Sequence, residues 1–135
     1  MFKFKRLSAI LLITLLFLSM SIAFADDNPI TFSNTFTVTN DGGKFNVGFV
    51  EIEFKKNSLP ANINQITLNA EIYAENGTVY IEFRPDVEKF DKHVHIRVDN
   101  YKGFIYDKTL GKNTEVNIKK FNFIADHFSR YALAR

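Results

Sequence analysis

The chain has no cysteine among its 135 residues, and this absence excludes several classes of protein. Without cysteine there are no disulfide bonds, so a folded domain must be held by packing and hydrogen bonding alone. Cysteine nucleophiles and thiolate metal sites are excluded for the same reason. A lipoprotein is excluded too, because the residue that carries the lipid is a cysteine.

The motifs of several large enzyme classes are also missing. The sequence contains no Walker phosphate loop, dinucleotide fingerprint, serine-hydrolase elbow or zinc-protease helix motif. Beyond its apolar start it has no helical stretch of useful length, no internal repeat and no low-complexity linker. We therefore expect no cofactor and no turnover of a substrate.

The start of the chain has the pattern of a secretory signal peptide, which we place at residues 1–25. Lys3, Lys5 and Arg6 form a basic beginning, an almost wholly apolar run follows, and Ala23-Phe24-Ala25 provides small residues at the two positions that a signal peptidase reads. A retained membrane anchor is the alternative, because a membrane-spanning helix needs about 20 apolar residues.

Removal of this leader changes the charge of the chain. Three of the 17 basic residues and none of the 15 acidic residues lie in residues 1–25, so residues 26–135 carry 14 basic and 15 acidic side chains, a net charge of −1. This balance gives no general electrostatic reason to bind nucleic acid or, after leader removal, a membrane. We expect a secreted or cell-surface protein with a single domain and an unknown protein or envelope component as partner.

Apolar and polar residues alternate with period two along most of the mature chain, which predicts β-strands. The predicted strands cover residues 30–39, 45–54, 66–74, 79–83, 94–98, 104–106, 116–123 and 128–134. A spacing of about ten residues with turn signals between is typical of a sandwich or barrel. We predict an all-β, antiparallel β-sandwich of eight or nine short strands, closed by the apolar last strand.

Five short segments carry finer expectations about this fold. Asn40–Gly43 predicts a hairpin turn into the next strand, and Glu75–Gly77 predicts a two-residue hairpin. A β-bulge is expected at Gly48-Phe49, because the apolar residues change parity there. Arg84-Pro85 predicts the end of a strand, and Lys119-Lys120 a parity slip within one strand.

The closing stretch His127–Leu133 and the segment Phe83–Asp86, followed by Phe90 and Lys92, resemble the ZU-five domain. This β-sandwich domain is shared by zonula occludens protein, ankyrins and netrin receptors, and has many copies in bacterial secreted and surface proteins. The resemblance covers about residues 42–134.

The chain also departs from the family pattern. Asn57 stands where a glycine is usual, within a segment that is a proline- and glycine-containing turn in relatives, and His93 stands where bacterial relatives often have proline. The second domain that often follows in animal proteins is absent from this sequence. These differences concern the register of the turn more than the fold.

The resemblance implies a self-processing hypothesis, because some animal members of the family cut themselves at His-Phe-Ser. Ser129 Oγ would attack the carbonyl carbon of Phe128, and His127, on the same side of an extended strand, would take the hydroxyl proton. The structural alternative is that His127 and Phe128 fill the edge of the core and Ser129 satisfies backbone groups.

Other side chains suggest weaker site hypotheses. His93 and His95 share one strand face and could contribute to a zinc or ligand site, although the pattern favours a solvated outer face with His93, His95 and Arg97. An acidic loop, Asp86–Asp91, lacks the spacing of a known calcium loop. Four tyrosines could line a sugar- or peptide-binding face or pack across strands: Tyr73, Tyr80, Tyr101 and Tyr106.

Three functional classes follow, in order of preference. The first is a secreted or cell-surface, non-enzymatic interaction domain. The second is a self-processing domain that cleaves the Phe128–Ser129 bond and keeps the clipped strand bound. The third is an extracellular ligand- or metal-binding protein that uses the His93 and His95 face.

Overall fold

The computed structural model describes residues 28–134, and these form ten β-strands and no helix. The strands are β1 (Phe32–Thr39), β2 (Gly43–Val47), β3 (Val50–Phe54), β4 (Gln65–Glu75), β5 (Thr78–Val87), β6 (Val94–Val98), β7 (Tyr101–Asp107), β8 (Lys112–Ile118), β9 (Phe121–Ala125) and β10 (Phe128–Ala134). The predicted all-β class is confirmed. The predicted signal peptide at 1–25 lies outside the described residues.

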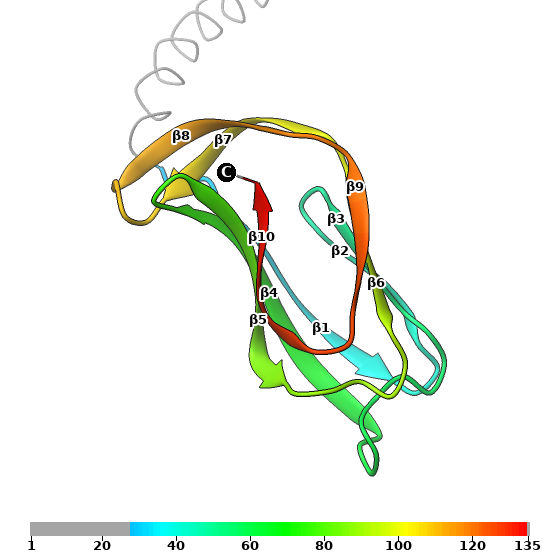
Figure 1. Ribbon diagram of the computed structural model, residues 1–135. Coiled ribbons are helices and arrows are strands. Elements are labelled where there is room, and N and C mark those ends of the chain that lie inside the picture. The colour runs from blue at the N-terminus through cyan, green and yellow to red at the C-terminus, as the bar shows by residue number, and fades with distance from the viewer. Residues whose placement is uncertain (1–27, 135) are drawn as a thin grey trace, which may run out of the picture.

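Two sheets face each other across a shared core (Figure 1). The six-stranded sheet has the order β10-β5-β4-β7-β8, with β1 also paired to β4, and the four-stranded sheet has the order β2-β3-β6-β9. All strand pairs are antiparallel except a one-residue parallel contact, Ala74 of β4 with Asp107 of β7. The pairing of β1 with β4 ends at Ile72, so β1 and β7 follow one another along one edge of β4.

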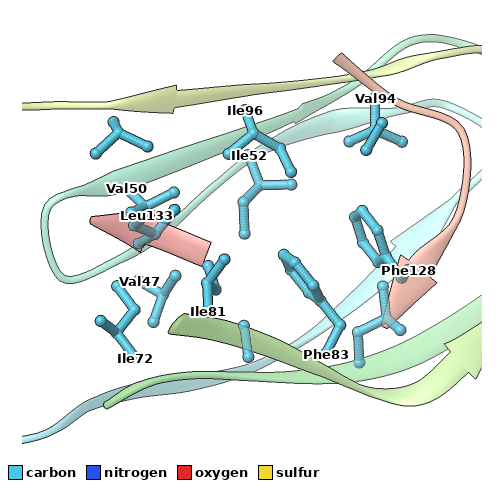
Figure 2. Close-up of a cluster of buried hydrophobic side chains, with 14 of the residues drawn as sticks. Val47, Val50, Ile52, Ile72, Ile81, Phe83, Val94, Ile96, Phe128 and Leu133 are labelled. Carbon is cyan, nitrogen blue, oxygen red and sulfur yellow. The ribbon is translucent and has the colours of Figure 1, made fainter. Parts of the chain in front are cut away.

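The core is built from the inward positions of both sheets, as the period-two pattern predicted. Figure 2 shows side chains from the two sheets meeting in one apolar layer. The labelled residues, each at most 6% exposed, are Val47, Val50, Ile52, Ile72, Ile81, Phe83, Val94, Ile96, Phe128 and Leu133. Because the domain has no disulfide bond, this layer must supply most of its stability.

The closing strand β10 lies at the edge of the six-stranded sheet and pairs with β5, as predicted (Figure 1, red). Phe128 and Leu133 point into the core and are 1% and 6% exposed. On the outer face, the Arg130 guanidinium lies 2.6 Å from the Glu75 carboxylate and 3.3 Å from the Tyr73 hydroxyl oxygen, both on β4. The last strand is therefore held on both of its faces.

The predicted bulge at Gly48-Phe49 is wrong, because these two residues form the tight turn of the β2–β3 hairpin. Gly48 has φ +54°, in the left-handed region that glycine adopts without steric cost, so the chain can reverse there. A Cβ on Gly48 would lie 2.7 Å from the Phe32 ring. The change of parity reflects two strands that both face the core, not one irregular strand.

Two segments carry the chain from one sheet to the other, although the sequence predicted a hairpin at one and a single irregular strand at the other. The chain turns at Asn40–Gly43, but it leaves the six-stranded sheet there and enters the four-stranded one, while β1 pairs with β4. Lys119-Lys120 separates β8 from β9, which lie in different sheets. The two sheets face the core from opposite sides. At each crossing, therefore, the other set of alternate residues along the chain points into the core.

The prediction that Arg84-Pro85 ends a strand is also wrong, since β5 continues to Val87. The partners of β10 jump from Val87 to Glu82 at this point, so Pro85 falls within an irregular part of the ladder. Proline has no backbone N–H, and its absence costs little stability where the neighbouring strands make no regular hydrogen bonds. The Glu75–Gly77 hairpin is confirmed: β4 and β5 pair directly across its turn.

A buried carboxylate ties two hairpin turns together at one end of the six-stranded sheet. Asp107, 0% exposed, accepts hydrogen bonds from four backbone N–H groups. Two of the donors lie in the β4–β5 turn, Asn76 (3.1 Å) and Gly77 (2.8 Å), and two in the β7–β8 turn, Thr109 (2.9 Å) and Leu110 (3.0 Å). Burial raises the pKa of Asp107, but these hydrogen bonds outweigh it and hold the pKa below its ordinary value.

Candidate functional site

The closing corner, residues 126–131, carries the chain from β9 in one sheet to β10 in the other. Phe128 stacks on Phe83 with ring centroids 3.9 Å apart and is only 1% exposed, so it anchors the corner in the core (Figure 2). The Tyr131 hydroxyl donates a hydrogen bond to the carbonyl oxygen of His127 at 2.7 Å. This contact resembles the tyrosine corner of β-sandwiches, where a hydroxyl bonds back to the backbone a few residues upstream.

The imidazole of His127 is engaged on both sides within this corner. Its Nδ1 lies 3.0 Å from the Asp126 carboxylate and its Nε2 lies 3.3 Å from the Tyr131 hydroxyl. The hydrogen bond with His127 holds the pKa of Asp126 below its ordinary value, whereas burial raises that of Tyr131. Both ring nitrogens thus have partners other than the predicted nucleophile.

Ser129 follows His127 by two residues in the chain but is not part of its hydrogen-bond network. Within residues 28–134 no hydrogen bond joins His127 to Ser129. The β10–β5 register shifts between Phe128 and Arg130, so Ser129 and the peptide bond before it lie in an irregular part of the ladder. Self-cleavage at Phe128–Ser129 stays a prediction.

The two histidines of the metal hypothesis lie at the start of β6. His93 is exposed in the preceding loop, and His95 is half-buried on the outer face, opposite Glu53 and Ile124. In the described part of the chain, no three His, Asp or Glu side chains lie close enough to hold a metal ion. A site at His93 and His95 stays a prediction.

Two of the candidate tyrosines pack within the domain. Tyr73 is 3% exposed although it is on the outer face, because the ammonium of Lys108 lies 3.7 Å from its ring centre. Tyr101 stacks on Phe49 at 4.7 Å, and both rings contact Phe32 edge-on. These residues make the cross-strand packing that was the alternative to a binding face.

A row of polar side chains crosses the outer face of the four-stranded sheet. The register places Asn46 of β2 opposite Glu51 of β3, Glu51 opposite Arg97 of β6, and Arg97 opposite Asn122 of β9. We call these four residues the polar row. All point away from the core, since their neighbours along each strand point into it. One row therefore offers two amides, a carboxylate and a guanidinium side by side.

The polar row lines a hollow of about 320 Å³ at the end of this sheet, which we call the depression. Its rim is formed by the β2–β3 turn, the end of β6 and the start of β9. The rim residues include Phe49, Asp99, Lys120 and Phe121. Phe121 pairs with Val98, so its ring lies on the inner face of the sheet, where it is 37% exposed and stacks on Phe123.

Arg97 organises the charges of the depression. Its Nη1 lies 3.1 Å from Glu51 and 2.7 Å from Glu53. The hydrogen bond with Arg97 lowers the pKa of Glu53 despite partial desolvation, so the carboxylate is ionised at neutral pH. Within residues 28–134, the side chains of Asn46, Lys120 and Asn122 make no hydrogen bond or ion pair, so their polar groups are free to meet a ligand.

This site could not be predicted from the sequence because its residues come from four separate strands. Arg97 falls within the predicted strand 94–98 and Asn122 within the predicted strand 116–123, and nothing local relates the two residues. The alternation along each strand shows that these side chains point outward. It cannot show which polar residues on different strands lie opposite one another. That requires the pairing of β3 with β6 and of β6 with β9.

The fold and these sites define an all-β, two-sheet domain with a polar hollow on the outer face of its smaller sheet. Comparison of the chain with protein-family models, with curated proteins and with solved structures gave no match. In the part of the chain that the structure describes, no helix is long and apolar enough to cross a membrane.

Proposed function

We propose that this chain is a secreted or cell-surface, non-enzymatic interaction domain that binds an envelope component through the depression. The observation that supports this best is a hollow in which some of the polar side chains have no role in the fold. The side-chain amides of Asn46 and Asn122, at the two ends of the polar row, are exposed and have no partner within residues 28–134. Side chains that neither pack nor pair in the free protein are available for recognition.

Export and a ZU-five-like domain are part of the same proposal. The apolar leader with its Ala23-Phe24-Ala25 site supports export, and the nearly neutral mature chain supports a partner other than nucleic acid. The tyrosine-corner contact at the end of the chain gives the His-Phe-Ser-x-Tyr motif a structural use. Tyr131 fixes the corner through its bond to the His127 carbonyl oxygen, and Phe128 fills the core by stacking on Phe83.

Binding to isolated envelopes tests this function. The exported protein, produced from the full chain, is sedimented with envelopes of the cells that make it, and the bound fraction is measured against protein concentration. We expect saturable binding that the Arg97→Ala/Asn122→Ala variant loses. The matched control is Arg84→Ala/Asn64→Ala, which removes another exposed arginine in an ion pair (3.2 Å to Glu82) and another exposed asparagine.

The control variant should bind as the unaltered protein does. Absence of saturable binding, or equal loss of binding in both variants, would contradict the proposed function.

Self-processing is the second candidate, and one observation favours it. The Phe128–Ser129 peptide bond lies at a register shift, where the backbone is not held by a regular ladder. In this reaction Ser129 Oγ would bond to the Phe128 carbonyl carbon, the C–N bond would break, and the Ser129 amine would leave with the proton. Water would then hydrolyse the ester to a Phe128 carboxylate and restore the Ser129 hydroxyl.

Intact mass of the exported protein under denaturing conditions separates the two candidates. A non-enzymatic domain gives one species that retains residues 129–135 after long incubation. Loss of residues 129–135 from the unaltered protein, but not from Ser129→Ala, would establish self-processing. His127→Ala should slow that loss if His127 is the base.

A further inference from the structure

From the chemistry of the depression, we infer that its ligand is a neutral oligosaccharide that lies across the four strands along the polar row. This inference rests on the proposed function and names the class of ligand for the same site. Four features of the described residues support it: the donor and acceptor pattern, the charge balance, the length of the row, and the position on a sheet face.

The donor and acceptor pattern matches hydroxyl groups. The amides of Asn46 and Asn122 each offer an acceptor oxygen and a two-proton donor nitrogen. Between them, Arg97 uses Nη1 for its ion pairs, which leaves its other guanidinium nitrogens as donors, and Glu51 keeps a second carboxylate oxygen as acceptor. A hydroxyl donates one hydrogen bond and accepts up to two, so adjacent sugar hydroxyls can satisfy such alternating groups.

The charges of the depression cancel. Arg97 and Lys120 are positive, and Glu51 and Asp99 are negative, so these four side chains sum to zero. Glu53, which also pairs with Arg97, is matched by Lys44 opposite it on β2. A phosphate or polyanionic ligand would meet two carboxylates, and a cationic ligand would meet a guanidinium and an ammonium. Like charges at close range are unfavourable, so the site discriminates against both and suits an uncharged ligand.

The dimensions of the site suit two or three sugar units. Neighbouring strands lie about 4.8 Å apart, so the three steps from Asn46 to Asn122 span about 14 Å. One pyranose unit in a chain has a length close to the strand spacing, so successive units can meet successive side chains. The hollow of about 320 Å³ is at the lower end of the range for small-ligand sites, and it is open to solvent along its length.

The position of the row disfavours an added peptide strand. The row crosses the face of the sheet, and its two central strands, β3 and β6, already pair on both sides. Their backbone groups are therefore used within the sheet, and a ligand on this face meets side chains only. Strand addition requires an open edge, so a peptide bound in that way would not contact Glu51 and Arg97 together.

A titration followed by amide NMR tests the ligand class directly. The exported protein, labelled with ¹⁵N, is titrated separately with cellotetraose, tri-N-acetylchitotriose and mannotriose as neutral probes. Tetragalacturonate is the anionic comparison. We expect saturable shifts for at least one neutral probe, centred on the amides of Asn46, Arg97 and Asn122, and weaker or no shifts for the anionic probe.

Two variants sharpen the test. Asn122→Ala should weaken binding of the neutral probe by about three- to tenfold, because the hydrogen bonds of its amide to sugar hydroxyls are lost. Asn64→Ala is the matched control, since Asn64 is an exposed asparagine outside the polar row, and its affinity should equal that of the unaltered protein. Equal weakening in both variants, or shifts centred away from the polar row, would overturn the inference.

The outcomes also separate this inference from the proposed function. If the envelopes bind through Arg97 and Asn122 but none of the neutral saccharides shifts the row or competes, the oligosaccharide assignment is wrong and the interaction domain stands. A peptide or anionic probe that competes instead would identify the ligand class that replaces it. If the envelopes do not bind at all, the proposed function itself fails.

Discussion

The closing corner and the polar row differ in how the fold uses their polar groups. In the closing corner, Asp126, His127 and Tyr131 bond to one another, and Phe128 is sealed in the core between them and β5. In the polar row, the central Arg97 is paired, but the amides at the ends have no partner within residues 28–134. The first region contributes to holding the fold and the second can contribute to recognition.

This difference shows why a suggestive motif need not be the functional site. His-Phe-Ser attracts attention because its residue types allow acyl chemistry, yet the structure gives each aromatic and imidazole group a packing or bonding partner. The polar row has no motif at all. The comparison therefore predicts that substitutions in the closing corner reduce stability, whereas substitutions in the row reduce binding.

The largest expected effect on stability is that of Phe128→Ala. Removing a buried aromatic side chain from a packed core costs about 3–5 kcal/mol of unfolding free energy. Phe121→Ala removes the same atoms from a side chain that is 37% exposed, next to Asn122 of the polar row, and should cost far less. Urea unfolding followed by circular dichroism measures both. Equal losses for the two variants would remove the distinction between core anchor and exposed rim.

Asp107→Asn should follow, with a loss of about 2–3 kcal/mol. The amide keeps the shape of the side chain but replaces an ionised acceptor of four N–H groups, and it places a donor nitrogen among donors. Glu115→Gln, at an exposed position of β8, is the charge-matched control and should have little effect. A small effect of Asp107→Asn would show that the two hairpin turns do not need the carboxylate.

The same carboxylate predicts a pH dependence of stability. The folded-state pKa of Asp107 lies below its unfolded value of about 3.9, so its contribution is fully present above that value and is lost as the pH falls through the folded pKa. Unfolding free energy should therefore fall more steeply between pH 5 and pH 2 in the unaltered protein than in Asp107→Asn. Parallel curves for the two proteins would contradict the lowered pKa.

Tyr131→Phe should have a smaller effect, about 1 kcal/mol. It removes only the hydroxyl that donates to the His127 carbonyl oxygen, and a single hydrogen bond contributes about this much. Tyr106→Phe is the control, because the Tyr106 hydroxyl makes no hydrogen bond within residues 28–134. If both variants unfold at the same urea concentration, the corner contact does not stabilise the fold.

The smallest effect on stability is expected for Asn122→Ala. An exposed side chain without a partner in the described chain should change the unfolding free energy by less than about 0.5 kcal/mol. The same substitution should nevertheless reduce envelope binding strongly. A large loss of stability would mean that the row supports the fold and is not free for a ligand.

The sequence predicted the strands well and their partners less well. Period-two alternation located the buried positions of β4 and β6, and the Asn-Gly pair predicted the β4–β5 hairpin, because both signals are local. The parity changes at Gly48 and Lys119 predict irregular strands, whereas the structure has a hairpin turn at the first and a change of sheet at the second. A change of sheet and an irregular strand give the same one-dimensional pattern, and only the pairing distinguishes them.

The candidate sites show the same limit. His127, Phe128 and Ser129 are neighbours in the chain, so a motif could suggest them, and the structure then supplied partners that local reasoning could not see. Asn46 and Asn122 belong to one row although 76 positions separate them in the sequence. Strand pairing brings the residues of such a site together, so the site can be recognised only when the register of the strands is known.

The envelope-bound fraction of Asn122→Ala and Tyr131→Phe, measured side by side below their unfolding transitions, tests the separation of the two regions most directly. We predict that Asn122→Ala loses binding while Tyr131→Phe, although less stable, binds as the unaltered protein does. Full binding by Asn122→Ala together with loss of binding by Tyr131→Phe would place recognition in the closing corner and contradict the role assigned to the polar row.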